Sequence, residues 1–173
     1  MHNLRILGLT GGIATGKSTA VKIIQALYPT AVIFDADAHV KKLYASEPLL
    51  SEIRECFGGQ SVVDGVLNRD FLRDLVFKNP EAKKQLEALV HPKVRKDCLA
   101  LLEKAKQHPA ATLFIADVPL LFEGSFDFGQ ELNLVVAVSR ETQILRLKQR
   151  NGFDDATVLA ILEAQLPLSL IHI

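Results

Sequence analysis

Residues 11 to 18 read Gly11-Gly12-Ile13-Ala14-Thr15-Gly16-Lys17-Ser18 and come directly after an apolar run, Leu4-Arg5-Ile6-Leu7-Gly8-Leu9. The spacing G-x-x-x-x-G-K-[ST] is typical of a loop whose backbone N–H groups surround phosphate oxygens, while the helix that follows offers its positive end to the same anion. In such a loop Lys17 reaches the β- and γ-phosphates of a nucleotide, and Ser18 holds Mg²⁺. We therefore expect residues 11 to 18, together with Thr19, to bind ATP.

Outward from this loop, apolar strand-like runs alternate with helical patterns. Such alternation is the mark of a parallel sheet with helices on both faces. A helix is expected directly after the loop, because Ala20, Ile23, Ile24 and Leu27 share one face at helical spacing. Strands are expected at residues 4–9, 31–34, 111–116 and 132–138. The sequence thus predicts a three-layer α/β P-loop fold, with a parallel sheet between two layers of helices.

The stretch between the second and third predicted strands is about 70 residues long and helical in pattern, which is too much for one crossover helix. Helix starts are marked by Asn68 before Arg69 and by Asn79 before Pro80. We expect this stretch to form a helical lobe over the sheet edge. Ligands of such sheets bind in the crevice at the carboxyl ends of the strands.

Composition limits the classes of protein that fit. The chain of 173 residues has 20 basic and 20 acidic side chains, so its formal net charge is zero. This balance favours small-molecule substrates over nucleic acid or a membrane surface. No run reaches the roughly 18 apolar residues of a membrane span, and no secretory signal is visible. We expect a cytoplasmic protein, monomeric or weakly homo-oligomeric, in which Cys56 and Cys98 are reduced structural thiols.

Two acidic residues follow the second predicted strand. Asp35 and Asp37 point the same way if the strand persists, and both would face the phosphates of the loop. A carboxylate there can accept the proton of an attacking hydroxyl group or bind Mg²⁺ through water. The alternative is that an aspartate simply caps a helix that begins at this point.

A third acidic residue, Asp117, follows the third predicted strand in the position of a Walker B aspartate. We expect it to help hold Mg²⁺ through water. The alternative is a polar residue that ends a strand ahead of Pro119.

One segment, residues 139–150, carries four basic residues and one acidic residue in a chain with no net charge. Residues 139–150 read as a capped helix on which Arg146 and Arg150, four residues apart, share a face. Guanidinium groups on that face could clamp a transferring phosphate, although a solvated helix face is the plainer alternative. His91 and Arg95 form a second pair, one helical turn apart, that could bind a phosphate or acid group of the second substrate. The alternative is a plain helix start, because Pro92 suits the first turn of a helix.

The order of these motifs resembles the dephospho-coenzyme A kinase family. Gly8 to Ser18 resembles its phosphate loop, and Asp35-Ala36-Asp37 resembles its DAD motif. The further matches are Leu67-Asn68-Arg69 with Leu75-Val76-Phe77, His91-Pro92 with Arg95, Pro119 to Glu123, Arg150, and Gln165 to Leu168. The resemblance covers residues 4 to about 168.

The resemblance implies transfer of the γ-phosphoryl group of ATP to the ribose 3′-hydroxyl of dephospho-coenzyme A (dephospho-CoA), the last step of coenzyme A synthesis. It implies one P-loop kinase domain of the nucleoside-kinase-like fold at residues 1–168. Within this domain, a helical lobe at about residues 37–106 would bind the acceptor substrate, and a lid would lie at about residues 140–165. Asp37 would be the base for the acceptor hydroxyl, while Lys17 and Arg150 would neutralise the migrating phosphoryl group. Arg146 would bind the nucleotide, and the acceptor contacts would be Asp35, Asn68, Arg69, His91 and Arg95.

Residues 169–173 depart from the family pattern, which continues with a basic helix, a strand and another helix. On the resemblance, the C-terminal strand and helix of the family are missing here, so we expect weaker nucleotide binding on a less stable scaffold. Two other functions stay open: a different small-molecule P-loop kinase, and an inactive nucleotide-binding module.

Overall fold

The computed structural model describes residues 4–119, 126–151 and 154–163, with 150 and 151 described by their backbone alone. The chain divides into two compact units. The first combines Met1–Phe34 with Leu102–Ile173, and the second is Asp35–Leu101. The first unit carries a parallel sheet, and the second is mostly helical.

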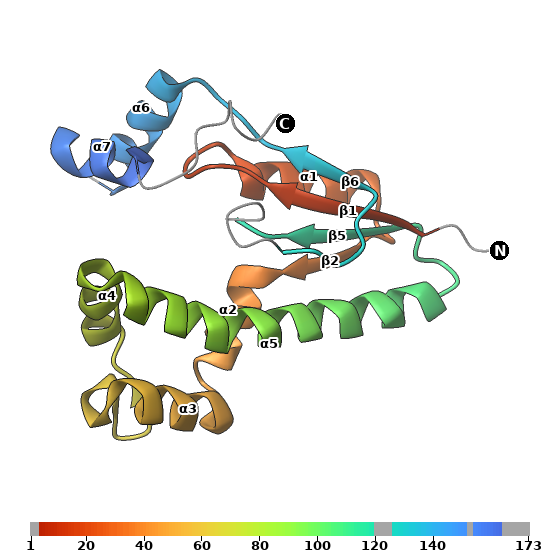
Figure 1. Ribbon diagram of the computed structural model, residues 1–173. Helices are drawn as coiled ribbons and strands as arrows, with labels where there is room; N and C mark the ends of the chain where they lie inside the picture. Colours follow the sequence, from red (N-terminus) through yellow and green to blue (C-terminus); the bar gives the residue numbers. More distant parts are fainter. Residues whose placement is uncertain (1–3, 120–125, 152–153, 164–173) are drawn as a thin grey trace. The chain divides into compact units, whose positions relative to one another are not determined.

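The sheet of the first unit has four strands in the order β2-β5-β1-β6 (Figure 1). They are β1 (Arg5–Thr10), β2 (Val32–Asp35), β5 (Leu113–Asp117) and β6 (Leu132–Val135). β1 pairs in parallel with both β5 and β6, so that Leu9 lies opposite Asp117 on one side and Leu134 on the other. Phe34, Phe114 and Ile115 are fully buried, as expected of strands covered on both faces. The predicted α/β fold with a parallel sheet is confirmed.

The fourth strand is shorter than its sequence predicts. The apolar run continues to Val138, but the last bond to β1 is the one that the Val136 N–H donates to the Thr10 carbonyl oxygen, at 2.8 Å. Pairing stops there because β1 ends at Thr10 and the chain turns into the glycine-rich loop. The loop thus decides where the neighbouring strand ends.

Three helices of the first unit surround the loop region: α1 (Lys17–Leu27), α6 (Arg140–Asn151) and α7 (Asp155–Glu163). The predicted helix after the loop is confirmed, but its apolar face is not buried, since Ile23 is 54% exposed and Leu27 69% exposed. Helices α6 and α7 instead share a small core of Leu147, Val158 and Leu162. Within the described residues, every helix lacks the combination of length and apolarity that crossing a membrane requires.

The second unit contains α2 (Ala36–Leu43), α3 (Glu47–Phe57) and α4 (Arg69–Lys78), and α5 (Pro80–Gln107) begins in it. Between α3 and α4 lie a 3₁₀ turn (Gly59–Ser61) and a two-stranded antiparallel hairpin of β3 (Val62–Val63) and β4 (Val66–Leu67). The predicted helix starts are confirmed. The Asn68 side chain accepts a bond from the Phe71 N–H at 3.2 Å, and the Asn79 side chain accepts from the Glu81 and Ala82 N–H groups.

The prediction that Pro92 stands in the first turn of a helix is wrong, because Pro92 lies inside the continuous helix α5. A proline there removes one backbone hydrogen bond and costs about 3 kcal/mol. The helix continues because Val90, Val94, Cys98 and Leu102, spaced four residues apart, are all buried on one stripe. Burying that stripe outweighs the single lost bond.

The two cysteines should differ sharply in reactivity. Cys98 is fully buried, and burial raises the pKa of its thiol to about 12, whereas Cys56 is exposed. Because the thiolate is the reactive form, one thiol should react quickly with an aromatic disulfide reagent in the folded protein and the second only after unfolding. A stopped-flow thiol titration of the wild type and Cys56→Ser checks this. A fast phase that survives in Cys56→Ser would contradict the assignment.

Candidate active site

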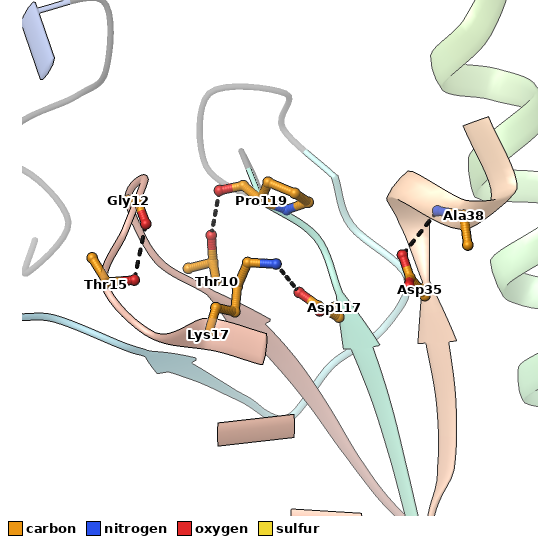
Figure 2. Close-up of polar contacts among 8 residues, drawn as sticks. All are labelled: Thr10, Gly12, Thr15, Lys17, Asp35, Ala38, Asp117 and Pro119. Atoms are coloured by element: carbon orange, nitrogen blue, oxygen red, sulfur yellow. Dashed lines mark hydrogen bonds and ion pairs between the residues drawn. The ribbon is translucent and has the colours of Figure 1, made fainter. Parts of the chain in front are cut away.

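The glycine-rich loop leaves β1 and returns as helix α1, and its shape depends on two glycines. Gly16 caps α1 with φ of 102°, a left-handed conformation that favours glycine. At Gly11 a Cβ atom would lie 2.5 Å from the Val136 carbonyl oxygen, so a side chain cannot fit there. The Thr15 hydroxyl closes the loop by donating to the Gly12 carbonyl oxygen at 2.9 Å (Figure 2).

The start of α1 offers backbone N–H groups and positive polarity, as a site for an anion requires. The N–H groups of Thr19 and Ala20 donate to the Gly16 carbonyl oxygen, at 2.9 and 3.0 Å. The N–H groups of Lys17 and Ser18 precede them in the first turn, where no carbonyl of the helix itself can accept them. Ser18 and Thr19 are exposed. Two N–H groups and the positive end of the helix dipole therefore remain for phosphate oxygens.

Lys17 forms an ion pair with Asp117, which joins the loop to the carboxyl end of β5 (Figure 2). Both side chains are largely buried, at 16% and 13% exposed. Thr10 makes a second link to this region, because its hydroxyl donates to the Pro119 carbonyl oxygen at 2.9 Å. The structure thus brings together the lysine and the aspartate that the sequence analysis singled out from distant motifs.

Oxygen ligands for a magnesium ion are available beside this pair. The Ser18 hydroxyl is exposed in the first turn of α1, and Asp117 offers a carboxylate. In the described part of the chain, no group of three or more His, Cys, Asp or Glu side chains could hold a metal by itself. Mg²⁺ commonly binds through one or two protein ligands together with substrate phosphates, so this donor set suits an ion that arrives with a nucleotide.

Helix α6 contacts the loop from outside. The Gln143 side chain donates to the Ile13 carbonyl oxygen at 2.8 Å. Arg146 Nη1 donates to the carbonyl oxygens of Ala14 and Thr15, both at 3.0 Å. The capped helix expected here is confirmed, since the Thr142 N–H donates to the Ser139 hydroxyl at 3.3 Å. Arg150 lies in the last turn of α6, with its side chain outside the described part.

Gln143 is not among the site residues predicted from the sequence. The available signal was its position three residues before Arg146, which places both side chains on one face of a helix. A neutral amide beside four basic residues carries no charge pattern of its own, so only the folded chain identifies its partner.

Asp35 and Asp37 have different surroundings at the start of α2. The Asp35 side chain caps the helix by accepting a bond from the Ala38 N–H at 2.9 Å (Figure 2). Asp37 is exposed in the first turn, and among the described residues it has no hydrogen bond or ion pair. The capping role that the sequence left open therefore belongs to Asp35.

The other predicted acceptor residues lie in the second unit. Both polar atoms of the Asn68 side-chain amide are hydrogen-bonded. The oxygen accepts a bond from the Phe71 N–H, and the nitrogen donates to the Gln60 carbonyl oxygen at 3.1 Å. Arg69 is exposed at the start of α4, and its charge opposes the rise in the pKa of Tyr44 that burial causes. His91 and Arg95 are both exposed, one turn apart on α5.

Two predicted motifs fall wholly or mainly outside the described residues. These are the segment from Leu120 to Glu123 and the segment Gln165-Leu166-Pro167-Leu168.

A family model described as dephospho-CoA kinase matches residues 5–169 of this chain. A dephospho-CoA kinase of Anaeromyxobacter dehalogenans is 40% identical over 172 residues, which covers 95% of this chain and 78% of that protein. The dephospho-CoA kinase of Bacillus anthracis is 36% identical over 165 residues, or 94% of this chain and 81% of that protein.

Two solved structures are also similar to this chain. A crystal structure from Thermus thermophilus superposes with a TM-score of 0.81 at 34% identity, covering 98% of this chain and 84% of that one. A dephospho-CoA kinase from Campylobacter jejuni gives a TM-score of 0.63 at 28% identity, covering 94% of this chain and 80% of that one.

Proposed function

The chain belongs to the dephospho-CoA kinase family, and on that premise we propose that it transfers the γ-phosphoryl group of ATP to the ribose 3′-hydroxyl of dephospho-CoA. The observation that carries the proposal is the phosphate loop at the end of β1, with Lys17 paired to Asp117 beside it. The reaction completes coenzyme A synthesis, and we assign it to the cytoplasm.

Phosphate binding would begin at the loop. The N–H groups of Lys17 and Ser18 would receive phosphate oxygens, and the Lys17 ammonium group would turn from Asp117 toward the β- and γ-phosphates. This exchange keeps the lysine charge partnered at each stage, which matters because an unpaired charge in a site so little exposed is costly. Charge stabilisation of this kind is the main help that phosphoryl transfer needs from a protein.

Ser18 and Asp117 would hold the magnesium ion that accompanies ATP. When bound, Mg²⁺ neutralises charge that develops on the phosphate oxygens. Asp117 would thus serve in turn as the partner of Lys17 and as an oxygen ligand.

Asp37 would be the base for the acceptor hydroxyl. Its carboxylate is exposed and bears no bond from another described residue, while the Asp35 carboxylate is held by the Ala38 N–H. A base must offer a lone pair to the proton it takes, and Asp37 has that capacity to spare. The proton of the ribose 3′-hydroxyl would pass to Asp37 as the oxygen attacks the γ-phosphorus, with ADP as leaving group. Asp35 would contribute by fixing the first turn of α2.

The cationic side chains divide into two groups. Arg146 uses one nitrogen for the loop carbonyls, so its remaining N–H groups could bind nucleotide phosphates, and Arg150 would neutralise the migrating group. His91, Arg95 and Arg69 would contact the acceptor, and Asn68 would position Arg69 by holding the first turn of α4.

The test is ADP release from ATP and Mg²⁺ with dephospho-CoA as acceptor, measured beside adenosine, AMP and shikimate. We expect release with dephospho-CoA to exceed release with each other acceptor by at least about 10²-fold in kcat/KM. The product should carry its new phosphate at the ribose 3′ position, which ³¹P NMR can assign.

Two results would contradict the proposal. Preferential turnover of another acceptor would indicate a different small-molecule kinase. Nucleotide binding without turnover of any acceptor would indicate a binding module.

A further inference from the structure

The outer side of the phosphate loop is held by helix α6, and we infer that Gln143 is a positioning residue that preorganises the loop for phosphate. The inference deepens the proposed function, because it concerns the nucleotide side of the same site. Three consecutive loop carbonyls, those of Ile13, Ala14 and Thr15, accept bonds from α6 at 2.8 to 3.0 Å. Gln143 supplies the first of these bonds and Arg146 the other two.

Peptide planes link these bonds to the anion site. In a planar trans peptide the C=O and N–H groups point in opposite directions. Holding a carbonyl outward therefore turns the N–H of the next residue inward, toward the space that phosphate oxygens occupy in such loops. The Ile13 carbonyl governs the N–H of Ala14 in this way, so Gln143 acts on the loop interior without touching it.

The loop needs such support because its backbone is strained at this point. Ala14 has φ of 59°, a left-handed conformation that a residue with a Cβ atom rarely adopts. Strained residues of this kind persist where their surroundings hold them from several sides. The bonds from Gln143 and Arg146 fall on the carbonyls directly before and at Ala14.

Apolar packing holds the same residues. Ile13 and Ala14 pack against the small core that α6 and α7 share, which Leu147, Val158 and Leu162 form. The packing fixes where the loop lies, and the hydrogen bonds fix which way its peptides turn. Because dispersion contacts have little directional preference, removing the Gln143 amide should alter the orientation of the Ile13 peptide more than the position of the loop.

The decisive variant is Gln143→Met, which keeps the length of the side chain and removes the donor. Gln143→Glu is the second variant, because at neutral pH its carboxylate offers the Ile13 carbonyl no hydrogen. Calorimetry should measure the affinities of both for ADP and for inorganic tripolyphosphate, a probe that lacks the nucleoside. We expect both ligands to bind about 5- to 10-fold more weakly to Gln143→Met, and at least as weakly to Gln143→Glu. KM for ATP should rise while KM for the acceptor stays unchanged.

The matched control is Gln149→Met, the same substitution at an exposed position of the same helix. It should leave both affinities within about twofold of the wild type. A loss confined to ADP would overturn the inference, because Gln143 would then recognise the nucleoside. Unchanged affinity in Gln143→Met, whether or not its melting temperature falls, would also overturn it. Neither ligand involves the acceptor, so failure to phosphorylate dephospho-CoA would count against the proposed function alone.

Discussion

Asp37→Asn should lower kcat for phosphoryl transfer by about 10²- to 10⁴-fold while leaving ATP affinity unchanged. Asparagine keeps the shape of the side chain but cannot accept the hydroxyl proton of the acceptor. Asp37 is exposed in the first turn of α2 and has no bond to another described residue, so the substitution should not disturb the fold. Steady-state kinetics with dephospho-CoA, together with calorimetric titration of ADP, measures the two effects separately.

Asp35→Asn is the matched control, because it makes the same chemical change two residues away. Asparagine is as good an N-cap as aspartate, so the bond from the Ala38 N–H should survive. We expect activity within about threefold of the wild type. The assignment of the base would be reversed if Asp35→Asn abolished transfer while Asp37→Asn did not.

Lys17→Ala should reduce transfer by about 10³-fold or more and weaken ATP binding at least about 10-fold. Lys17 is the only charged residue of the loop, and its side chain is 16% exposed, so water screens its charge little. Its loss also removes the ammonium group that faces Asp117, so the Asp117 carboxylate repels phosphate more strongly. Both effects act against the nucleotide.

Lys22→Ala provides the comparison, because Lys22 is an exposed lysine on the same helix. Its activity and ATP affinity should match those of the wild type within about twofold. Circular dichroism melts of both variants distinguish loss of the site from loss of the fold. Retention of transfer by folded Lys17→Ala would remove the lysine from the mechanism.

Local patterns in the sequence were sufficient for most of the fold. The glycine spacing, the apolar runs and the Asn68 and Asn79 caps each depend on residues within a few positions of one another. Backbone conformation responds to such neighbours directly, so the loop, the parallel sheet and the starts of α4 and α5 could be predicted. The same patterns, in their order along the chain, also indicated the family.

The position of Pro92 within its helix could not be predicted from its local sequence. Its chemistry favours a helix start, but α5 passes through it, because an apolar stripe on both sides of the proline is buried. The stability of a helix in a protein comes mainly from tertiary packing of its apolar face, and that packing overrode the local preference.

The sequence by itself determined which residues could take part in the site: Lys17 and Ser18 in the loop, Asp35 and Asp37 at the end of β2 and just beyond it, and Asp117 at the end of β5. Tertiary structure alone decided what these residues contact. It paired Lys17 with Asp117, 100 positions away, and joined Gln143 to Ile13, 130 positions away. The cap of α2 is instead a local bond over three residues, which the sequence offered as an alternative and the structure assigns to Asp35, with Asp37 exposed. The physical reason is that a side-chain contact depends on strand register and helix packing, which bring together residues that no sequence spacing connects.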